Sequence, residues 1–334
     1  MHAYQIQSDA GIPDAIVRTE LPDPTPGPGD VAIAVRACSL NYRDTIVAAG
    51  GYPRNDTRPI IALSDCAGEI VEVGSDVQDW SVGDRVSPNF LRDHPGGKTT
   101  EAHLNTGLGG SVDGVLAERI VMPAHALVRV PEHLDFEQAA TLPCAALTAW
   151  NALTSADTTA GQTVLLLGTG GVSIFGLQLA HAMGCRTIIT SSSDAKLEQA
   201  KSLGADVTIN YANDPEWHKQ VHAATDGVGV DNVLEVGGNG TLERSIKATA
   251  VGGTISLIGL LSDGQPNILP ALLNSQTIRG IYVGSVEQFR AMNRCLTQHK
   301  ITPVIDRTFP FDQTHNAYQY FASQKHVGKV VITL

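Results

Sequence analysis

The residues best suited to chemistry in this sequence form a glycine-rich turn. Four apolar residues, Val164–Leu167, run directly into Gly168-Thr-Gly-Gly171, and an amphipathic segment follows from Val172. This order predicts a strand, a tight turn and a helix, which is the context that a dinucleotide pyrophosphate site requires. Glycines let the backbone approach the phosphates, and the free N–H groups of the helix N-terminus attract them. The residues expected to bind the dinucleotide here are Gly168, Thr169, Gly170, Gly171 and Val172.

Ser173 stands where the third glycine of this motif would be. In the dinucleotide-binding fingerprint that glycine lets the helix pack closely on the strand. A serine there predicts either looser packing or a hydroxyl group near the ligand, and the sequence leaves both interpretations open.

The end of the second predicted strand indicates which dinucleotide binds. Sites specific for NAD carry an acidic residue about 20 positions past the first glycine, where it bonds the ribose 2′-hydroxyl. Here the sequence reads Thr190-Ser-Ser-Ser-Asp194, so Ser191 takes the place of the carboxylate. Hydroxyl groups can donate hydrogen bonds to a 2′-phosphate, which a carboxylate would repel. With Ser192, Lys196 and Tyr211, Ser191 predicts a phosphate pocket and NADPH as the cofactor.

The serine run also has a purely structural interpretation. These residues can cap the helix predicted from Ala195, with the Lys196 side chain simply solvated. The carboxylate of Asp194 further disfavours a phosphate nearby.

Alternating strand and helix patterns surround the glycine turn from about residue 163 to 260. Near-continuous apolar strands are typical of parallel strands buried on both faces, and repeated βα units predict a doubly wound parallel sheet. The predicted strands are Thr163–Leu167, Arg186–Thr190, Asp206–Ile209, Val230–Glu235 and Gly253–Ile258. The predicted helices are Val172–Met183, Ala195–Leu203, Glu216–Ala224 and Leu242–Ala250.

Two further glycines follow predicted strands of this sheet. Gly237 comes after the fourth strand and Gly259 after the fifth. Ligands bind at the carboxyl edge of such sheets, so both are candidate cofactor contacts. Turn formation explains them equally well.

The rest of the chain has a different pattern. Strands predicted at Val31–Ala37, Glu69–Val73 and Arg119–Val121 are separated by proline and glycine, which indicates a compact mostly-β domain. Residues 94–114 are predicted to form a long loop, and Glu137–Leu153 a helical bridge.

The tail breaks the βα rhythm, and we therefore expect it to return to the first domain. Its predicted helices are Gln288–His299 and Thr314–Ser323, and its predicted strands lie near Val304–Phe309 and at Lys329–Leu334. The expected domains are a catalytic domain at 1–125, a cofactor domain at 126–270 that begins with the bridge, and a return at 271–334.

Several sequence blocks identify a family resemblance. They are Asn41-Tyr-Arg-Asp44, Gly50-Gly-Tyr-Pro53, Ala67–Gly74, Val82–Val86 and Leu142–Trp150. In their order and spacing the chain resembles the medium-chain dehydrogenases/reductases, in the zinc-independent quinone oxidoreductase-like branch, over nearly its whole length. The resemblance implies a GroES-like, mostly-β catalytic domain and a Rossmann domain for the cofactor. It also implies a homo-oligomer, which we expect to be a homodimer.

The resemblance allows a test for the catalytic zinc. Zinc-dependent members of this family use a Cys, a His and a second Cys as ligands, with a Glu adjacent to the His. By alignment of the blocks, these positions hold Asn41, Ser64 and Cys144, with Asp65 in place of the Glu. One thiol with an amide and a hydroxyl is a poor zinc site, so we expect no metal.

The cysteines leave one alternative open. The loop at about 90–114 lacks the four closely spaced cysteines of the family's structural zinc lobe. A rearranged metal site could still be built from Cys144 with Cys38 or Cys66. No Cys-x-x-Cys pair supports it, and small buried core thiols are the simpler interpretation.

Without a metal, hydrogen-bond donors must stabilise the negative charge that develops on a reacting oxygen. The resemblance implies that Asn41, Asp44 and Tyr52 have this stabilising role. An amide can donate to a carbonyl oxygen or orient the ribose, and the Tyr52 hydroxyl can supply a proton. Alternatively, Tyr52 packs in its turn and Asp44 braces the following helix. The resemblance also places Thr148 and Lys329 near the cofactor.

Composition limits the partners. The net charge of −11, from 23 basic and 34 acidic residues, disfavours general binding to nucleic acid or to anionic membranes. No apolar run is long enough to span a bilayer, and the N-terminus has no secretory signal pattern. Five cysteines without a Cys-x-x-Cys pair fit reduced thiols, so we expect a cytoplasmic protein.

These patterns predict an NADPH-dependent oxidoreductase that reduces a small-molecule quinone or α,β-unsaturated carbonyl compound by hydride transfer without zinc. One alternative is an alcohol dehydrogenase or ketone reductase on the same scaffold. Another is a protein that binds NADPH with little turnover.

Overall fold

The computed structural model describes residues 1–8, 10–52, 58–259 and 261–334. Pro53 of the predicted turn motif lies outside these ranges. The chain forms two compact units: Met1–Leu147 with Val283–Leu334, here called the first unit, and Thr148–Tyr282, the second unit. The sequence predicts boundaries after residues 125 and 270.

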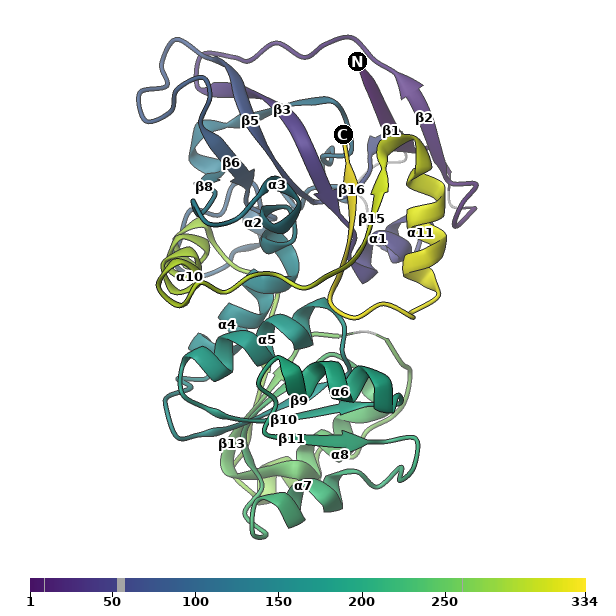
Figure 1. Cartoon of the computed structure of the whole chain (residues 1–334), viewed down its shortest axis with the longest axis vertical. Helices are drawn as coiled ribbons and strands as arrows, with labels where there is room; N and C mark the ends of the chain where they lie inside the picture. Colours follow the sequence, from purple (N-terminus) through teal and green to yellow (C-terminus); the bar gives the residue numbers. More distant parts are fainter. Residues whose placement is uncertain (9, 53–57, 260) are drawn as a thin grey trace. The chain divides into compact units, whose positions relative to one another are not determined.

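Two antiparallel-rich sheets build the first unit (Figure 1). One has the strand order β2-β1-β4, with β1 (His2–Ile6), β2 (Ile16–Glu20) and β4 (Ile60–Ile61). The other has the order β15-β16-β3-β5-β6-β8, and β7 also pairs with β3. Its strands are β3 (Asp30–Ser39), β5 (Asp65–Val73), β6 (Arg85–Pro88), β7 (Arg119–Pro123), β8 (Leu127–Arg129), β15 (Ile305–Pro310) and β16 (Lys329–Thr333).

The chain tail, Val283–Leu334, belongs to this unit. Strand β16 pairs antiparallel with the end of β3, where Val331 lies opposite Ser39. Figure 1 shows the two strands side by side although they come from opposite ends of the chain. The helices of this unit are α1 (Tyr42–Ala48), α2 (Glu101–Leu104), α3 (Phe136–Ala139), α10 (Val286–His299) and α11 (Thr314–Ala322).

The predicted helical bridge at Glu137–Leu153 is not one continuous helix. Helix α3 ends at Ala139, a π-helical turn covers Leu142–Ala146, and α4 (Leu147–Ser155) follows. Pro143 has no N–H to donate, and the N–H of Cys144 donates to the side chain of Asp65 rather than only within the helix. The π-helical turn therefore aims a backbone donor at the first unit's polar interior.

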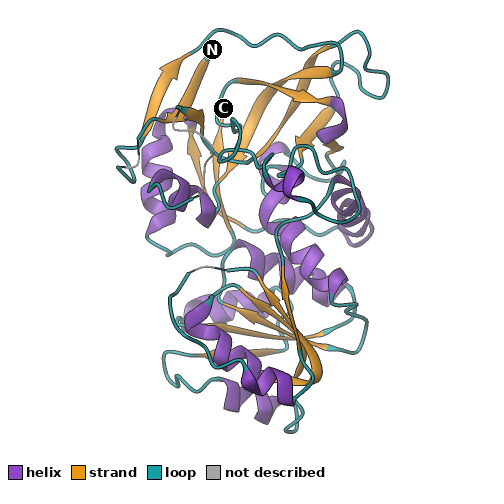
Figure 2. Cartoon of the chain, turned by 180° about the vertical axis from the view of Figure 1, so that it is seen from behind, coloured by secondary structure: helices purple, strands orange, loops and turns teal. Residues whose placement is uncertain are grey.

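A parallel sheet forms the second unit, in the order β11-β10-β9-β12-β13-β14. Figure 2 shows helices on both faces of it, which confirms the predicted doubly wound fold. The strands are β9 (Thr163–Leu167), β10 (Arg186–Ser191), β11 (Val207–Asn210), β12 (Val230–Glu235), β13 (Thr249–Leu257) and β14 (Thr277–Gly280). The helices are α5 (Gly171–Ala182), α6 (Asp194–Ser202), α7 (His218–Ala224), α8 (Asn239–Ala248) and α9 (Leu269–Leu273).

This strand order places a topological switch point between β9 and β12. The chain winds outward from β9 through β10 and β11, then continues from β12 in the other direction. Ligands bind at the carboxyl ends of the strands at such a point. The predicted glycines 168–171 and Gly237 follow the two strands that flank it. Among the described residues, no helix is long and apolar enough to cross a membrane.

Candidate functional site

The glycine turn has the geometry that a pyrophosphate requires. Gly168 adopts φ +73°, a conformation that favours glycine, and Gly170 is the N-cap of α5. A Cβ added at either position would meet no atom within 4 Å. The space beside both glycines is therefore open, and phosphate groups placed there can accept hydrogen bonds from the N-terminal N–H groups of α5.

The structure resolves the role of Ser173. Its Oγ donates to the carbonyl oxygen of Leu167 at 2.6 Å, and the side chain is buried. Helix α5 instead approaches the sheet most closely at Gly176, where an added Cβ would lie 2.6–2.7 Å from methyl groups of Leu166 and Leu234. The close-packing glycine is thus one helical turn later than expected. Neither looser packing nor a hydroxyl directed at the ligand is needed to explain the serine.

A cavity of about 350 Å³ opens at the carboxyl ends of the second unit's strands. It brings together three predicted residues, Gly168, Tyr211 and Gly237, while Ser191, Ser192 and Lys196 do not line it. Its remaining lining residues, which the sequence did not single out, are Leu167, Thr190, Pro215, Trp217, Val236, Thr241, Arg244 and Leu261.

Of the predicted phosphate-binding residues, Tyr211 lines this cavity and Ser191 is hydrogen-bonded to Tyr211. Ser191 ends β10, is buried, and its carbonyl oxygen accepts from Tyr211 N at 3.0 Å. Ser193 is the N-cap of α6, but its side chain makes no capping hydrogen bond. Asp194 Oδ1 accepts from Asn210 Nδ2 at 2.6 Å, which partly satisfies the carboxylate that argued against a phosphate. Lys196 follows within the first turn of α6.

Arg244 is a cationic residue of this cavity that no sequence pattern indicates. It lies on α8, lines the cavity with Tyr211, and its Nη1 donates to the carbonyl oxygen of Gly240 at 3.0 Å. An arginine near the ribose accommodates the 2′-phosphate in many NADP sites. The signal in the sequence was weak, because nothing in the spacing links α8 to the end of β10.

A buried carboxylate shapes the turn after β12. Glu235 Oε1 accepts from the N–H groups of Gly237 and Gly238 at 2.8 and 3.0 Å, and from Thr241 Oγ1 at 2.6 Å. Its Oε2 accepts from Ser245 Oγ. Four donors hold this side chain, so Glu235 fixes the position of Gly237 at the switch point.

Gly259 and Thr148 occupy constrained places in the second unit. A Cβ at Gly259 would fall 1.6 Å from the carbonyl oxygen of Val236, so the two loops touch through their backbones. The glycine is thus required for packing. Thr148 is buried near the start of α4.

In the first unit, Asn41 and Asp44 lie together at the start of α1. Asn41 is the N-cap, and its N–H donates to Asp44 Oδ2 at 2.7 Å. Asp44 therefore braces the helix, one of the two roles considered from the sequence. Burial raises the pKa of Asp44 to about 7, although the Arg43 guanidinium and the Asn41 N–H oppose this rise.

Tyr52 lies against a different neighbour. The guanidinium of Arg43 stacks over its ring at 4.4 Å, and also over Phe90 at 4.7 Å. The half-buried Tyr52 packs on the first unit's apolar core. The cation–π contact fixes its ring.

Next to Asn41 lies a buried polar group that we call the lysine cluster: Asn41, Asp44, Ser64, Asp65, Cys144 and Lys329. Asp65 accepts from Ser64 Oγ at 2.6 Å and from Cys144 N at 3.1 Å. Burial raises the pKa of Asp65, and the Lys329 ammonium is the largest influence in the opposite direction. Every member comes from the first unit: from the N-cap and first turn of α1, the start of β5, the π-helical turn and the start of β16.

The donor set of the lysine cluster does not fit a catalytic zinc. Zinc binds cysteine as a thiolate. Cys144 is the one thiol at the positions of the family's ligands. The amide of Asn41 and hydroxyl of Ser64 replace two stronger ligands. Among the residues that the structure describes, no group of three or more His, Cys, Asp or Glu side chains is arranged to hold a metal.

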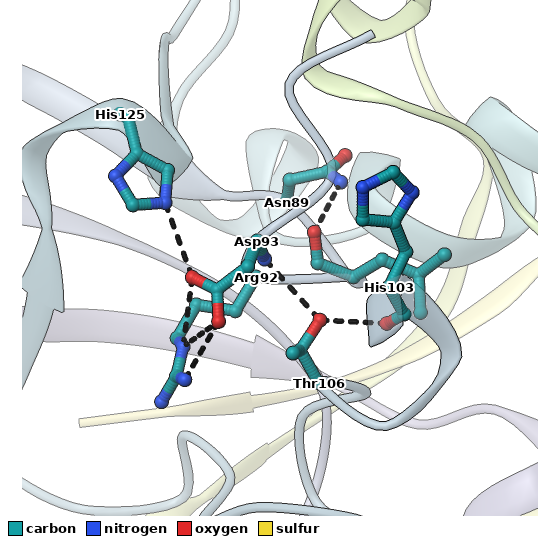
Figure 3. A network of polar contacts seen from close by, with 7 residues as sticks. Asn89, Arg92, Asp93, His103, Thr106 and His125 are labelled. Carbon is teal, nitrogen blue, oxygen red and sulfur yellow. Dashed lines mark hydrogen bonds and ion pairs between the residues drawn. The ribbon is translucent and has the colours of Figure 1, made fainter. Parts of the chain in front are cut away.

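The loop at 90–114 is fastened by side-chain contacts (Figure 3). Arg92 pairs with Asp93 at 2.7 Å, and His125 reaches the same carboxylate at 3.1 Å. Thr106 Oγ1 accepts from Asp93 N and donates to the carbonyl oxygen of His103. These contacts tie together the segment where the family's structural zinc lobe would lie.

Two family models match the chain. The alcohol dehydrogenase GroES-like domain matches residues 27–132, and the zinc-binding dehydrogenase model matches residues 171–298. The first match lies within the first unit, and the second runs through most of the second unit and into the first unit's C-terminal part, which begins at Val283.

Similar proteins span nearly the same length. A zinc-type alcohol dehydrogenase-like protein of Schizosaccharomyces pombe is 48% identical, over 92% of this chain and 91% of its own. An acryloyl-coenzyme A reductase of Metallosphaera sedula is 30% identical, over 94% of this chain and 95% of its own. A mycobacterial protein solved in complex with NADPH is 29% identical, with a TM-score of 0.84 over 100% of both chains.

Proposed function

Because the chain belongs to the medium-chain dehydrogenase/reductase superfamily, we propose that this oxidoreductase reduces a quinone or an α,β-unsaturated carbonyl compound with NADPH and without zinc. The observation that carries the proposal is the lysine cluster. At the positions of the family's zinc ligands it holds Asn41, Ser64 and Cys144, around a lysine rather than a metal-binding set. Hydrogen bonds must then do the work of a Lewis acid.

The cofactor assignment has two kinds of support. The glycine turn and cavity of the second unit offer open space for a dinucleotide, and a serine stands where NAD sites hold an acid. The mycobacterial relative was solved with NADPH. Gly168, Gly170 and the N-terminus of α5 would hold the pyrophosphate, with Tyr211, Arg244 and the Ser191 turn around the 2′-phosphate.

The substrate class is argued from the chemistry of the first unit. Bound NADPH supplies a hydride from C4 of its nicotinamide. When hydride adds to the β-carbon of an enone, negative charge develops on the carbonyl oxygen, and a proton must be delivered to complete the reduction. Asn41 can donate to that oxygen, and Tyr52 is the proposed proton source. The acryloyl-coenzyme A reductase relative acts on an acyl group of this class.

The proposal is tested by following NADPH oxidation against quinones, enones, ketones and aldehydes, with metal content measured on the same sample. We expect turnover with quinones or enones that EDTA does not change. Tyr52→Phe should lower kcat at least about tenfold and leave the Kd for NADPH unchanged. Full activity in this variant would remove Tyr52 as the proton source.

A second candidate function is that of an alcohol dehydrogenase or ketone reductase, which the name of the S. pombe relative favours. Turnover restricted to alcohols and ketones, lost with EDTA and restored by zinc, would establish it in place of the first. Tight NADPH binding without oxidation by any acceptor would instead indicate a low-turnover binding protein.

We further propose a cytoplasmic homodimer. The five cysteines are free thiols, as in a reducing compartment. Helix α9 exposes Leu269, Leu272 and Leu273, and β14 ends the parallel sheet with an edge that pairs only with β13 among the described strands. Apolar patches and open edges of this kind are typical of protein–protein interfaces.

A further inference from the structure

Lys329 is the most unusual charged residue in the first unit. Only 2% of it is exposed, at the first position of β16. Its Nζ donates to the carbonyl oxygen of Leu40 and to Asn41 Oδ1, both at 2.5 Å. An ammonium group buried so deeply is costly unless it is paired, so its neighbours must account for it.

Those neighbours are acidic. Burial lowers the pKa of Lys329, and Asp65, Cys144 and Asp44, in that order, oppose this decrease. The Lys329 ammonium is likewise the main influence that favours the charged form of Asp65. The buried charges of Lys329 and Asp65 therefore stabilise each other.

The second observation concerns the amide of Asn41. The bond from Lys329 occupies Oδ1, which leaves Nδ2 as the free end of the amide. Asn41 is buried, and its Nδ2 lies close enough to the Asp65 carboxylate to favour the charged form as a hydrogen-bond donor. No acceptor among the described residues meets Nδ2 with full hydrogen-bond geometry, so the donor has capacity for a further acceptor. A buried donor that is not fully satisfied is costly, so Nδ2 is suited to donate to a substrate oxygen.

We propose that the Lys329 ammonium takes the place of the catalytic metal cation in this protein. It balances the Asp65 charge and holds Asn41 by Oδ1, so that the Nδ2 donor faces a reacting carbonyl oxygen. Lys329 is thus a positioning residue that acts through Asn41, an inference that rests on the proposed zinc-free reduction. Two of the four positions that surround a zinc ion in zinc-dependent members here hold groups that favour the Lys329 ammonium: Asn41, which accepts its hydrogen bond, and Asp65, which carries the opposite charge.

In this arrangement, the positive charge and the contact with the substrate oxygen, both of which a metal ion would supply, come from two different side chains. The cation supplies the positive charge that the buried carboxylate needs, and it repels any divalent ion from the same space. The amide supplies the hydrogen bond to the substrate. Its donor strength is increased because its oxygen accepts from a charged group.

The test compares Lys329→Met with Lys325→Met, a matched change at an exposed lysine four residues earlier, and adds Asp65→Asn and the double variant Asp65→Asn/Lys329→Met. We expect Lys329→Met to lower Tm by about 5–10 °C, because it leaves the Asp65 charge unpaired. The double variant should recover most of that loss. Lys325→Met should behave as the wild type.

Kinetics separate positioning from folding. In Lys329→Met, or in the double variant if the single one does not fold, kcat should fall at least about tenfold while the Kd for NADPH stays within about twofold. In the double variant, Tm should recover while kcat stays low. If Lys329 only stabilised the fold, kcat would recover together with Tm. Wild-type protein should contain far less than one zinc ion per chain.

Several results would overturn the inference. One is that the wild type contains one zinc ion per chain and loses stability when EDTA removes it. Another is that Lys329→Met leaves Tm unchanged, or that the Tm losses of the two single variants add in the double variant. The last is that the double variant keeps the wild-type kcat. If none of the tested acceptors supports NADPH oxidation by the wild type, the proposed function fails. The zinc measurement and the Tm cycle still decide whether Lys329 replaces the metal charge.

Discussion

Asp44 is a carboxylic acid that titrates near neutral pH. Burial raises its pKa to about 7, while Arg43, the Asn41 N–H and Lys329 lower it and Asp65 raises it further. The Asp44 charge in turn adds to the effect of burial in raising the pKa of the Tyr318 phenol. In the unfolded chain an aspartate has a pKa of about 3.9. Between about pH 4 and pH 7 the native state therefore binds more protons, and its stability falls as the pH rises through that range.

Asp44→Asn should remove this dependence. The asparagine still offers an oxygen to the Asn41 N–H, so the cap is retained. Relative to the variant, the wild type should lose on the order of 2 kcal/mol of unfolding free energy between pH 4 and pH 7. Urea unfolding across this range measures it, with the exposed Asp263→Asn as control. Parallel stability curves for wild type and Asp44→Asn would contradict the prediction.

Arg244 is expected to determine the preference for the phosphorylated cofactor. It lines the cavity beside Tyr211, at the edge of the sheet where the ribose would lie. Arg244→Gln should weaken NADPH binding about tenfold and NADH binding less than about twofold, because only NADPH loses a charge pair. Titration of both cofactors measures this. Lys247→Gln, on the same helix and paired with Glu243, is the matched control. Equal losses for the two cofactors would exclude a phosphate contact.

Among the secondary-structure elements, the strand–turn–helix unit was predictable because its signals are local. The bounds of β9 were predicted to the residue and those of α5 within one position, since an apolar run and glycines determine both. The role of Ser173 was not predictable, because it depends on which strand side chains lie under α5. Leu234 of β12 is one of them and lies far away in the sequence.

The two glycines of this unit should respond differently to alanine. Gly176→Ala places a methyl group 2.6–2.7 Å from Leu166 and Leu234, and overpacking of this kind costs roughly 1–3 kcal/mol of stability. Gly170→Ala meets nothing within 4 Å and has a φ of −75°, so the fold should be unaffected. Its methyl group would instead occupy the cofactor's space, and NADPH affinity should fall at least about tenfold.

Thermal unfolding and NADPH titration of both variants check this contrast. A loss of stability in Gly170→Ala, or unchanged NADPH affinity in it, would contradict the assigned role of the turn. An unchanged Tm in Gly176→Ala would show that α5 can move away from the sheet.

At the scale of the whole molecule, the sequence predicted the fold class but not the lysine cluster. Lys329 and Asn41 are 288 positions apart, and they meet only because β16 pairs with β3. No periodicity links such residues. The same limit applies to the bridge, because its π-helical turn responds to the Asp65 carboxylate from another part of the chain.

The proposed dimer rests on surface that a single copy leaves uncovered. Leu272 and Leu273 are 74% and 75% exposed on α9, close in sequence to the edge strand β14. Pairing of two such edges would bury leucines and unsatisfied strand groups together, which stabilises the association. We expect Leu272→Glu/Leu273→Glu to convert a dimer to a monomer in light scattering after size-exclusion chromatography, because two buried carboxylates oppose association. Val82→Glu, at a valine of the first unit that is 65% exposed, should remain dimeric. A monomeric wild type, or a dimer that survives the double change, would place the interface elsewhere or remove it.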